Sequence, residues 1–157
     1  MADPTRTHLL SAIGLAHSAR EHGNHPFGAV LTDPAGTVLL TAENTVLTDR
    51  DVTAHAEINL VRLASRTLDP AQLTVATLYS STEPCAMCAG AIYWSGIRRV
   101  VYALGASELI AIAGADPEEP VLDLPCRRVF AAGGDTVEVS GPHLYEEAAA
   151  VHAAYWG

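Results

Sequence analysis

LTVATLYSSTEPCAMCAGAIYWSGIRRVVYAL, residues 73–104, is the stretch whose pattern decides the fold class. Leu73–Ser80 and Arg99–Leu104 are almost continuous apolar runs, which are typical of strands covered on both faces of a sheet. Between them, Pro84 marks a helix start, and the small residues of Cys85–Ser95 predict a short helix. Two buried strands joined by a helix indicate an α/β fold layered around one sheet.

The segments on either side continue this alternation of strands and helices. Apolar residues at intervals of three and four predict helices over Pro4–His22 and Ala54–Leu68. The turn signal Asp33–Gly36 lies between two short runs rich in Val and Leu, which predict a β-hairpin. The two hairpin strands are expected at Phe27–Thr32 and Thr37–Ala42. Later in the chain we expect a helix at Ser107–Ile112, a strand at Thr136–Val139 and a terminal helix at His143–Trp156. Residues 43–53 and 114–128 show no clear hydrophobic period. Because no repeat or linker divides the chain, we expect one domain over residues 1–157.

Composition excludes several classes of protein. The chain has 157 residues, 49% of them apolar, which suits a packed core and excludes a disordered chain. No apolar run approaches the roughly 20 residues of a membrane span, and no signal-peptide pattern opens the chain, so we expect a cytoplasmic protein with no membrane partner. All nine basic residues are Arg, and the absence of Lys excludes Schiff-base and P-loop chemistry. The net charge of −9 would repel polyanions, which disfavours a nucleic-acid partner.

Cysteine and histidine spacing points to a metal site. The chain has three cysteines and no secretion signal, which does not describe a disulfide framework. His55, Cys85 and Cys88 each belong to a predicted helix start, and together they offer zinc three ligands and leave its fourth position to water. An open position is typical of a catalytic zinc, and Glu57 could reach the bound water without ligating the metal. Alternatively, Cys126 could be a fourth ligand of a closed structural site, or a small buried apolar residue.

These residues also resemble a known family. His55-x-Glu57, with Pro84-Cys85-x-x-Cys88 beginning 27 positions after the Glu, is similar to the signature of the cytidine deaminase superfamily. Within it, the chain most resembles the bacterial guanine deaminase branch, over about residues 8 to 105. The matching stretches are Pro26–Val30, Glu43-Asn44, Thr53–Glu57, Tyr79–Cys88 and Gly90–Trp94. Beyond residue 113 the similarity is poor.

The resemblance implies a fold, a cofactor and a set of site residues. The fold would be a three-layer α/β/α sandwich with a mixed five-stranded sheet, holding one zinc ion (Zn2+) per subunit. Zinc would lower the pKa of its water toward about 7, and Glu57 would move protons from that water to the ring and to the departing ammonia. Phe27 and Asn44 would line the base pocket, the Ala56 amide would bond the base, and Trp94 would cover its ring.

The implied function is hydrolysis of the exocyclic amine of a free nucleobase or nucleoside. Guanine, converted with water to xanthine and ammonia, is the leading substrate, and another aminopurine, a nucleoside or cytosine are the alternatives. A tRNA adenosine deaminase and an inactive zinc-binding module are less favoured, because the chain is acidic and Glu57 is intact. The resemblance further implies a homodimer, with possible exchange of C-terminal segments.

Several residues keep a second interpretation. Asn44 could simply close a turn, and Trp94 could be an ordinary core residue. The aromatic C-terminus could shield the zinc water, or its helix could only cover the sheet. Asp116, Glu146 or Glu147 could be the acid that selects the substrate. Six histidines are expected in surface or local hydrogen-bonding roles: His8, His17, His22, His25, His143 and His152.

Overall fold

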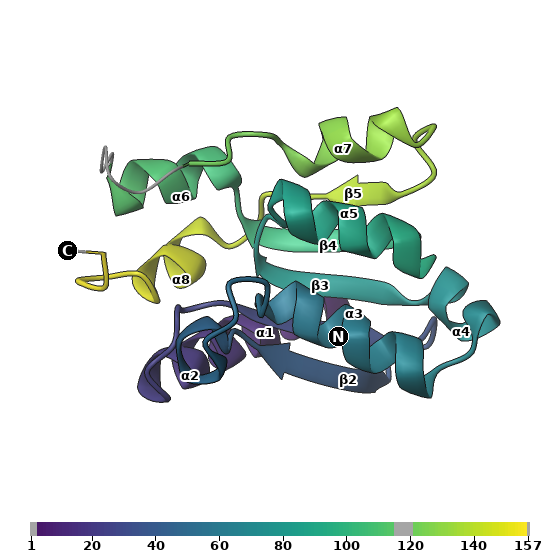
Figure 1. Cartoon of the computed structure of the whole chain (residues 1–157), viewed down its shortest axis with the longest axis horizontal. Coiled ribbons are helices and arrows are strands. Elements are labelled where there is room, and N and C mark those ends of the chain that lie inside the picture. Colours follow the sequence, from purple (N-terminus) through teal and green to yellow (C-terminus); the bar gives the residue numbers. More distant parts are fainter. Residues whose placement is uncertain (1–2, 115–120, 157) are drawn as a thin grey trace.

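A computed structural model describes residues 3–114 and 121–156 of the chain. Its strands form one sheet in the order β2-β1-β3-β4-β5 (Figure 1). β1 runs antiparallel to both of its neighbours, whereas β3, β4 and β5 run parallel to one another. The strand bounds are β1 (Gly28–Thr32), β2 (Val38–Glu43), β3 (Thr77–Thr82), β4 (Arg99–Leu104) and β5 (Glu138–Ser140). The expected mixed five-stranded sheet is therefore confirmed.

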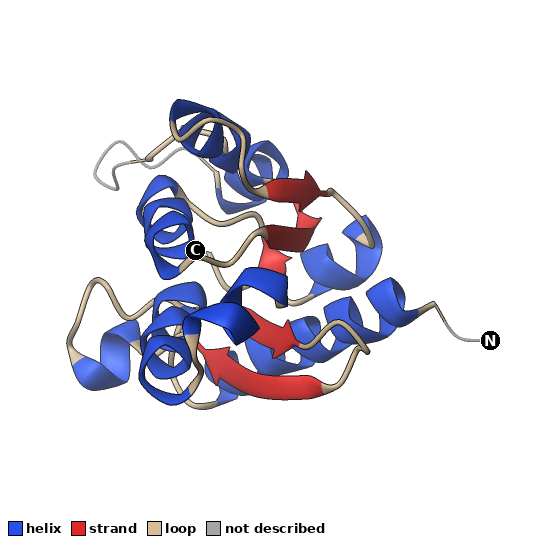
Figure 2. Ribbon diagram, turned by 90° about the vertical axis from the view of Figure 1, so that its right-hand side faces the viewer, coloured by secondary structure: helices blue, strands red, loops and turns tan. Residues whose placement is uncertain are grey.

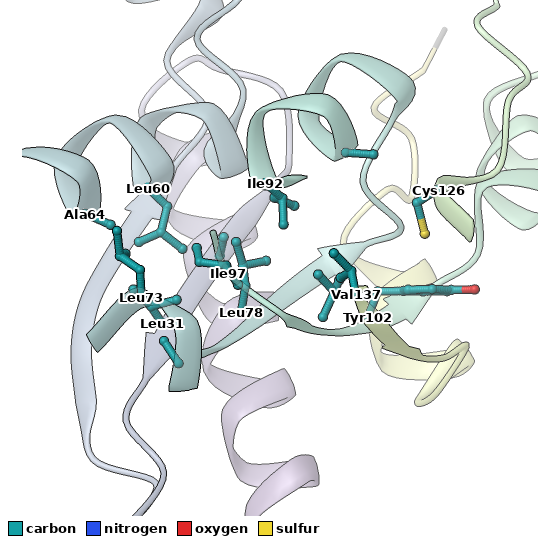
Figure 3. Packing of buried hydrophobic residues seen from close by; sticks show 14 of the residues in the cluster. Leu31, Leu60, Ala64, Leu73, Leu78, Ile92, Ile97, Tyr102, Cys126 and Val137 are labelled. Atoms are coloured by element: carbon teal, nitrogen blue, oxygen red, sulfur yellow. The ribbon is translucent and has the colours of Figure 1, made fainter. Parts of the chain in front are cut away.

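Helices cover both faces of this sheet, as the turned view shows (Figure 2). One face carries a buried cluster to which α3, α4, α5 and α7 contribute, and part of this cluster is drawn in Figure 3. The other face carries a second cluster to which α1 and α8 contribute. The helices are α1 (Pro4–Glu21), α2 (Val46–Asp49), α3 (Ala56–Thr67), α4 (Pro70–Val75), α5 (Ala86–Ser95), α6 (Ala106–Ala113), α7 (Cys126–Ala132) and α8 (Tyr145–Ala150). The expected α/β/α layering follows from these two clusters.

Close packing of α1 on β1 depends on one glycine. A Cβ atom built at Gly28 would lie 2.3 Å from the Ala12 carbonyl oxygen and 2.7 Å from the Ala16 nitrogen. Any other residue at this position would push the helix away from the strand. Gly28 thus brings α1 close to the strand that follows His25 and Phe27 along the chain.

The apolar run from Leu73 to Ser80 is not a single strand. Its first three residues end α4, and β3 begins only at Thr77. Asp69 starts this helix because its side chain accepts a hydrogen bond from the Gln72 nitrogen while Gln72 bonds back to the Asp69 nitrogen, a capping box. Leu73 still reaches the core, but it does so from a helix, which is why its apolar character suggested a strand.

Two short helices form where the sequence showed no clear hydrophobic period. α2 lies within residues 43–53, and α7 begins within residues 114–128.

The C-terminal helix is shorter than expected. The terminal helix ends at Ala150, and Ala154 has a left-handed backbone conformation with φ of 55°. The chain therefore turns after α8, and Tyr155 lies beyond the helix, which the sequence had predicted to reach Trp156.

None of the helices in the described ranges is both long enough and apolar enough to cross a membrane.

Candidate active site

Two helix starts bring the predicted metal ligands together. His55 is the N-cap of α3 and Cys85 is the N-cap of α5, and neither side chain caps its own helix. The imidazole and the thiol are therefore free to face each other. His55 Nδ1 lies 3.7 Å from Cys85 Sγ and 3.4 Å from Cys88 Sγ. The ligand atoms of all three residues lie within 4.8 Å of one another.

This geometry fits zinc. Bond lengths of about 2.3 Å to sulfur and 2.0–2.1 Å to nitrogen place neighbouring tetrahedral ligands about 3.6 Å apart. The two observed nitrogen–sulfur distances, 3.4 and 3.7 Å, bracket that value. His55, Cys85 and Cys88 would hold the ion and leave one tetrahedral position free, as in catalytic zinc sites. The expected zinc cofactor agrees with this donor set.

The ligand side chains interact strongly even without a metal. A hydrogen bond from the Cys88 thiol, helped by His55, lowers the pKa of Cys85 to about 4. The same bond, together with burial, raises the pKa of Cys88. A hydrogen bond with Cys85 raises the pKa of His55. One thiolate is thus already favoured at this position, and thiolate is the form of cysteine that binds zinc.

Glu57 lies in the first turn of α3, beside these ligands but not among them. Its side chain is only 5% exposed, and burial raises the pKa of its carboxyl group. Ser80 Oγ donates a hydrogen bond to Glu57 Oε1 at 2.8 Å, and the interactions of the carboxyl with Cys88 and Ser80 moderate this rise in its pKa. A buried carboxyl with a raised pKa, close to the metal ligands, is suited to accepting and returning protons.

Cys126 lies in the apolar core. It is fully buried in the same cluster as Tyr102 and Val137, which Figure 3 labels. Burial, with a contribution from Glu83, raises the pKa of Cys126 to about 12, so its thiol stays neutral. Within residues 3–114 and 121–156, one group of side chains has ligand atoms close enough together to share a metal ion, and Cys126 is not in it. These observations favour the small buried residue over a fourth zinc ligand.

A cavity of about 510 Å³ opens beside Cys85. Its polar lining residues include His25 and Glu83, and no Arg lines it among the described residues. Glu83 Oε1 accepts a hydrogen bond from the Ala106 nitrogen and Glu83 Oε2 accepts one from the Cys126 nitrogen, so this carboxylate ties down the starts of α6 and α7. The remaining lining residues are Ala106, Leu109, Ile110, Ala113, Gly114, Val121, Leu122, Leu124, Tyr155 and Trp156. A largely apolar cavity with a few polar groups is typical of small-molecule sites.

The C-terminal tail forms one wall of this cavity. Arg20 donates hydrogen bonds to the carbonyl oxygens of Val151 (2.9 Å) and Ala153 (2.7 Å), which fixes the turn after α8. Trp156 Nε1 donates to His152 Nδ1 at 3.0 Å, and burial lowers the pKa of His152 to about 4, which keeps this nitrogen an acceptor at neutral pH. α8 therefore covers the sheet, while the residues after it face the cavity. The helix covers the sheet as one interpretation expected, and shielding of the zinc water by the residues after it stays a prediction.

The residues expected to contact the base have different surroundings. Phe27 packs near His152 and Trp156, with ring centroids 5.4 and 6.3 Å apart. Asn44 is buried, and its Oδ1 accepts a hydrogen bond from the Val46 nitrogen, as the turn interpretation expects. Ala56 is buried as the first residue of α3. Trp94 is 84% exposed, and like Phe27, Asn44 and Ala56 it is not among the residues that line the cavity.

Sequence reasoning overlooked three residues around the site. His25 and Glu83 line the cavity, and Ser80 contacts Glu57. The signal for Ser80 was a polar residue inside a buried strand, which requires a hydrogen-bonding partner. Of the acids considered for substrate selection, Glu146 does not line the cavity and Glu147 pairs with Arg6 at 2.9 Å. Asp116 lies outside the described residues.

Comparison with known proteins agrees with this site. The zinc-binding region of the cytidine and deoxycytidylate deaminases matches residues 3–104. A probable cytosine deaminase of Schizosaccharomyces pombe is 40% identical over 156 residues, 99% of this chain and 94% of that protein. The guanine deaminase of Bacillus subtilis is 43% identical over 98 residues, 62% of each chain.

Two further likenesses extend this picture. The tRNA-specific adenosine deaminase of Haemophilus influenzae is 42% identical over 97 residues, 62% of this chain and 55% of that protein. The solved structure of a guanine deaminase from Nitrosomonas europaea superposes with a TM-score of 0.79 at 26% identity, covering 99% of this chain and 85% of that one. The zinc ligands, the buried glutamate and these matches lead to one conclusion: the chain belongs to the cytidine and deoxycytidylate deaminase family and is a zinc-dependent nucleobase or nucleoside deaminase.

Proposed function

We propose that this protein hydrolyses the exocyclic amine of a free nucleobase or nucleoside, and that guanine is its preferred substrate, yielding xanthine and ammonia. The observation that carries the proposal is the position of Glu57, buried next to His55, Cys85 and Cys88 without belonging to the ligand set. A closed structural zinc site would have no use for a buried carboxyl at this place. We therefore assign Glu57 as the catalytic residue, and the three ligands as the residues that hold zinc.

The proposed reaction needs two proton transfers on one side of the ring. Zinc, when bound, supplies a Lewis acid that lowers the pKa of a coordinated water toward about 7. The Glu57 carboxylate takes a proton as water adds to the ring carbon that bears the amine, and it passes this proton to the adjacent ring nitrogen. It then takes the second proton of the added oxygen and delivers it to the amine, which leaves as ammonia. The raised pKa that burial gives Glu57 suits a group that must both accept and release protons.

The cavity supports a small, uncharged substrate. Its walls are largely apolar and aromatic, with Trp156 and Leu109 among them, and no Arg lines it among the described residues. A planar base would stack on such walls, whereas a phosphate would find no cation. We propose that Phe27, Asn44 and the Ala56 amide contact the base near Glu57. Cytosine is the second candidate, because the relative that matches over nearly the whole chain is a probable cytosine deaminase.

A substrate panel tests this proposal. Zinc-loaded protein is mixed with guanine, cytosine, adenine, their nucleosides and unmodified tRNA, and ammonia release is followed. We expect the highest kcat/KM with guanine and no inosine in tRNA, because a chain with net charge −9 cannot neutralise many phosphates. A higher kcat/KM with cytosine would change the assigned substrate from guanine to cytosine. Submicromolar tRNA binding at physiological salt, with inosine formed in the tRNA, would refute the proposal that the substrate is a free nucleobase or nucleoside. No ammonia from any of them would refute the proposed function.

The wall formed by the tail should influence substrate choice. Trp156→Ala is expected to lower kcat/KM for the best substrate by about tenfold, the size of one lost aromatic contact, with zinc retained and melting little changed. Tyr145→Ala removes another aromatic side chain, 50% exposed and not lining the cavity, and should leave kinetics unchanged. Equal behaviour of the two variants would mean that Trp156 has no part in the site.

Other expectations rest on the resemblance. We propose that residues 1–157 form one deaminase domain and that the protein forms a homodimer. The high exposure of Trp94 is consistent with a contact to a second copy, through which this ring could still reach a base. Exchange of C-terminal segments stays a prediction, since the tail here lines the cavity of its own chain. The cytoplasmic location also stays a prediction.

A further inference from the structure

Ser80 is a polar residue at the centre of the sheet. It lies on β3, opposite Ala29 of β1 and Tyr102 of β4, so its backbone is held from both sides. Its side chain is fully buried. Leu78, two residues earlier on the same strand, belongs to the cluster packed under α3 and α5. Because side chains two apart in a strand share a face, Ser80 points to the side of the sheet from which Glu57 comes.

The Ser80 hydroxyl has two hydrogen-bond partners. Ser80 Oγ lies 2.8 Å from Glu57 Oε1 and 2.6 Å from the Thr82 carbonyl oxygen. Glu57 lies two residues after His55 at the start of α3, so the Ser80 hydroxyl links this carboxyl to β3 beside the ligand group. A glutamate side chain has three rotatable bonds, and packing alone restrains it less than a directional hydrogen bond.

We propose that Ser80 is a positioning residue of the deamination reaction: its hydroxyl holds one oxygen of Glu57 in place, so that the carboxyl keeps its orientation toward the ligand group. This inference rests on the proposed function for its kinetic part and on geometry for the rest. A central strand is a good support, because groups held by strands and helices are placed more precisely than groups held by loops.

The neighbouring residue provides a matched control. Ser81 is also buried, and its Oγ accepts a hydrogen bond from the Gly28 nitrogen at 3.1 Å. It projects from the other face of the same strand, away from Glu57. Ser80→Ala and Ser81→Ala therefore make the same chemical change in adjacent buried positions, and only the first should affect the placement of Glu57.

Both variants are compared with wild type as zinc-loaded proteins. We expect Ser80→Ala to lower kcat by about ten- to a hundredfold with KM within about threefold, because a catalytic group that loses its orientation acts less often. Ser81→Ala should melt at a lower temperature and keep kcat within about twofold. Each should bind one zinc per chain. Ser80→Thr, which restores the hydroxyl, should recover most of the rate.

Two measurements separate positioning from general damage. In a Glu57→Gln background, adding Ser80→Ala should cost no further activity, because the serine acts through the glutamate. In crystal structures of the metal-free proteins, Glu57 should take a second side-chain conformation in Ser80→Ala but not in Ser81→Ala. The structural comparison does not depend on activity, so it tests Ser80 even if the wild-type protein deaminates none of the substrates offered.

The proposal is overturned if Ser80→Ala keeps kcat within twofold of wild type, or if both alanine variants lose kcat equally. It is also overturned if Glu57 stays in one unchanged conformation without the hydroxyl, or if Ser80→Ala fails to bind zinc. A Ser80→Thr variant that folds, binds zinc and loses as much kcat as Ser80→Ala would show that the hydroxyl is not what positions Glu57.

Discussion

Replacing Glu57 with Gln is expected to reduce turnover by at least about a thousandfold while leaving zinc content and folding intact. A positioned acid–base group contributes about 10²–10⁴-fold, and this carboxyl would serve two transfers in one cycle. The amide has nearly the same shape and can still bond to Ser80, so the buried site should stay packed. Steady-state ammonia release, zinc analysis and thermal melting of the variant check these three statements.

Residual activity within about tenfold of wild type would remove Glu57 from the proton-transfer role. Loss of zinc in the variant would mean that the carboxylate is a metal ligand, contrary to the ligand set of His55, Cys85 and Cys88. Asn59 offers a control on the same helix. Its side chain bonds to the Glu43 carbonyl oxygen and to Thr45 Oγ1. Asn59→Ala should cost stability but not several orders of magnitude in rate.

Replacing Cys88 with Ala should abolish both zinc binding and activity. Two remaining protein ligands hold zinc poorly, and the free energy of metal binding is lost from folding stability, so the variant should also melt at a lower temperature. Zinc analysis of the purified protein should find less than about one ion per ten chains, against one per chain in wild type.

Cys126 supplies the matched control for this experiment. It is a buried cysteine like Cys88, but it lies in the apolar cluster and outside the ligand group. Cys126→Ala should keep one zinc per chain and activity within about twofold, at the expense of roughly 1 kcal/mol of stability for the lost sulfur atom. Zinc loss in this variant would mean that the site is closed and structural, and the proposed function would then have to be abandoned.

The candidate metal ligands and the position of Glu57 beside them could be predicted from sequence because their geometry is local. His55 and Cys85 immediately precede α3 and α5, whose start and end signals are visible in the chain. Position at a helix start fixes the direction of such side chains. The alternation of strand, helix and strand over residues 77–104 likewise follows from local patterns. The error at Leu73–Val75 shows the limit of this reasoning, since an apolar run of that length suits a strand or a helix turn equally well.

The contacts around the site follow from packing between distant segments. Arg20 holds the tail through carbonyl oxygens 131 and 133 positions later, and Ser80 meets Glu57 across 23 positions. No short-range sequence pattern predicts such contacts, because they depend on how helices and strands that are distant in the chain pack against one another. The sequence by itself determined the α/β class, the group of possible zinc ligands and the place of Glu57 beside it, all of which are properties of single elements and their ends. Only the tertiary structure decided that Cys126 is in the core, that the tail lines the cavity, that Trp94 is exposed and that Ser80 contacts Glu57, because each of these is a relation between elements.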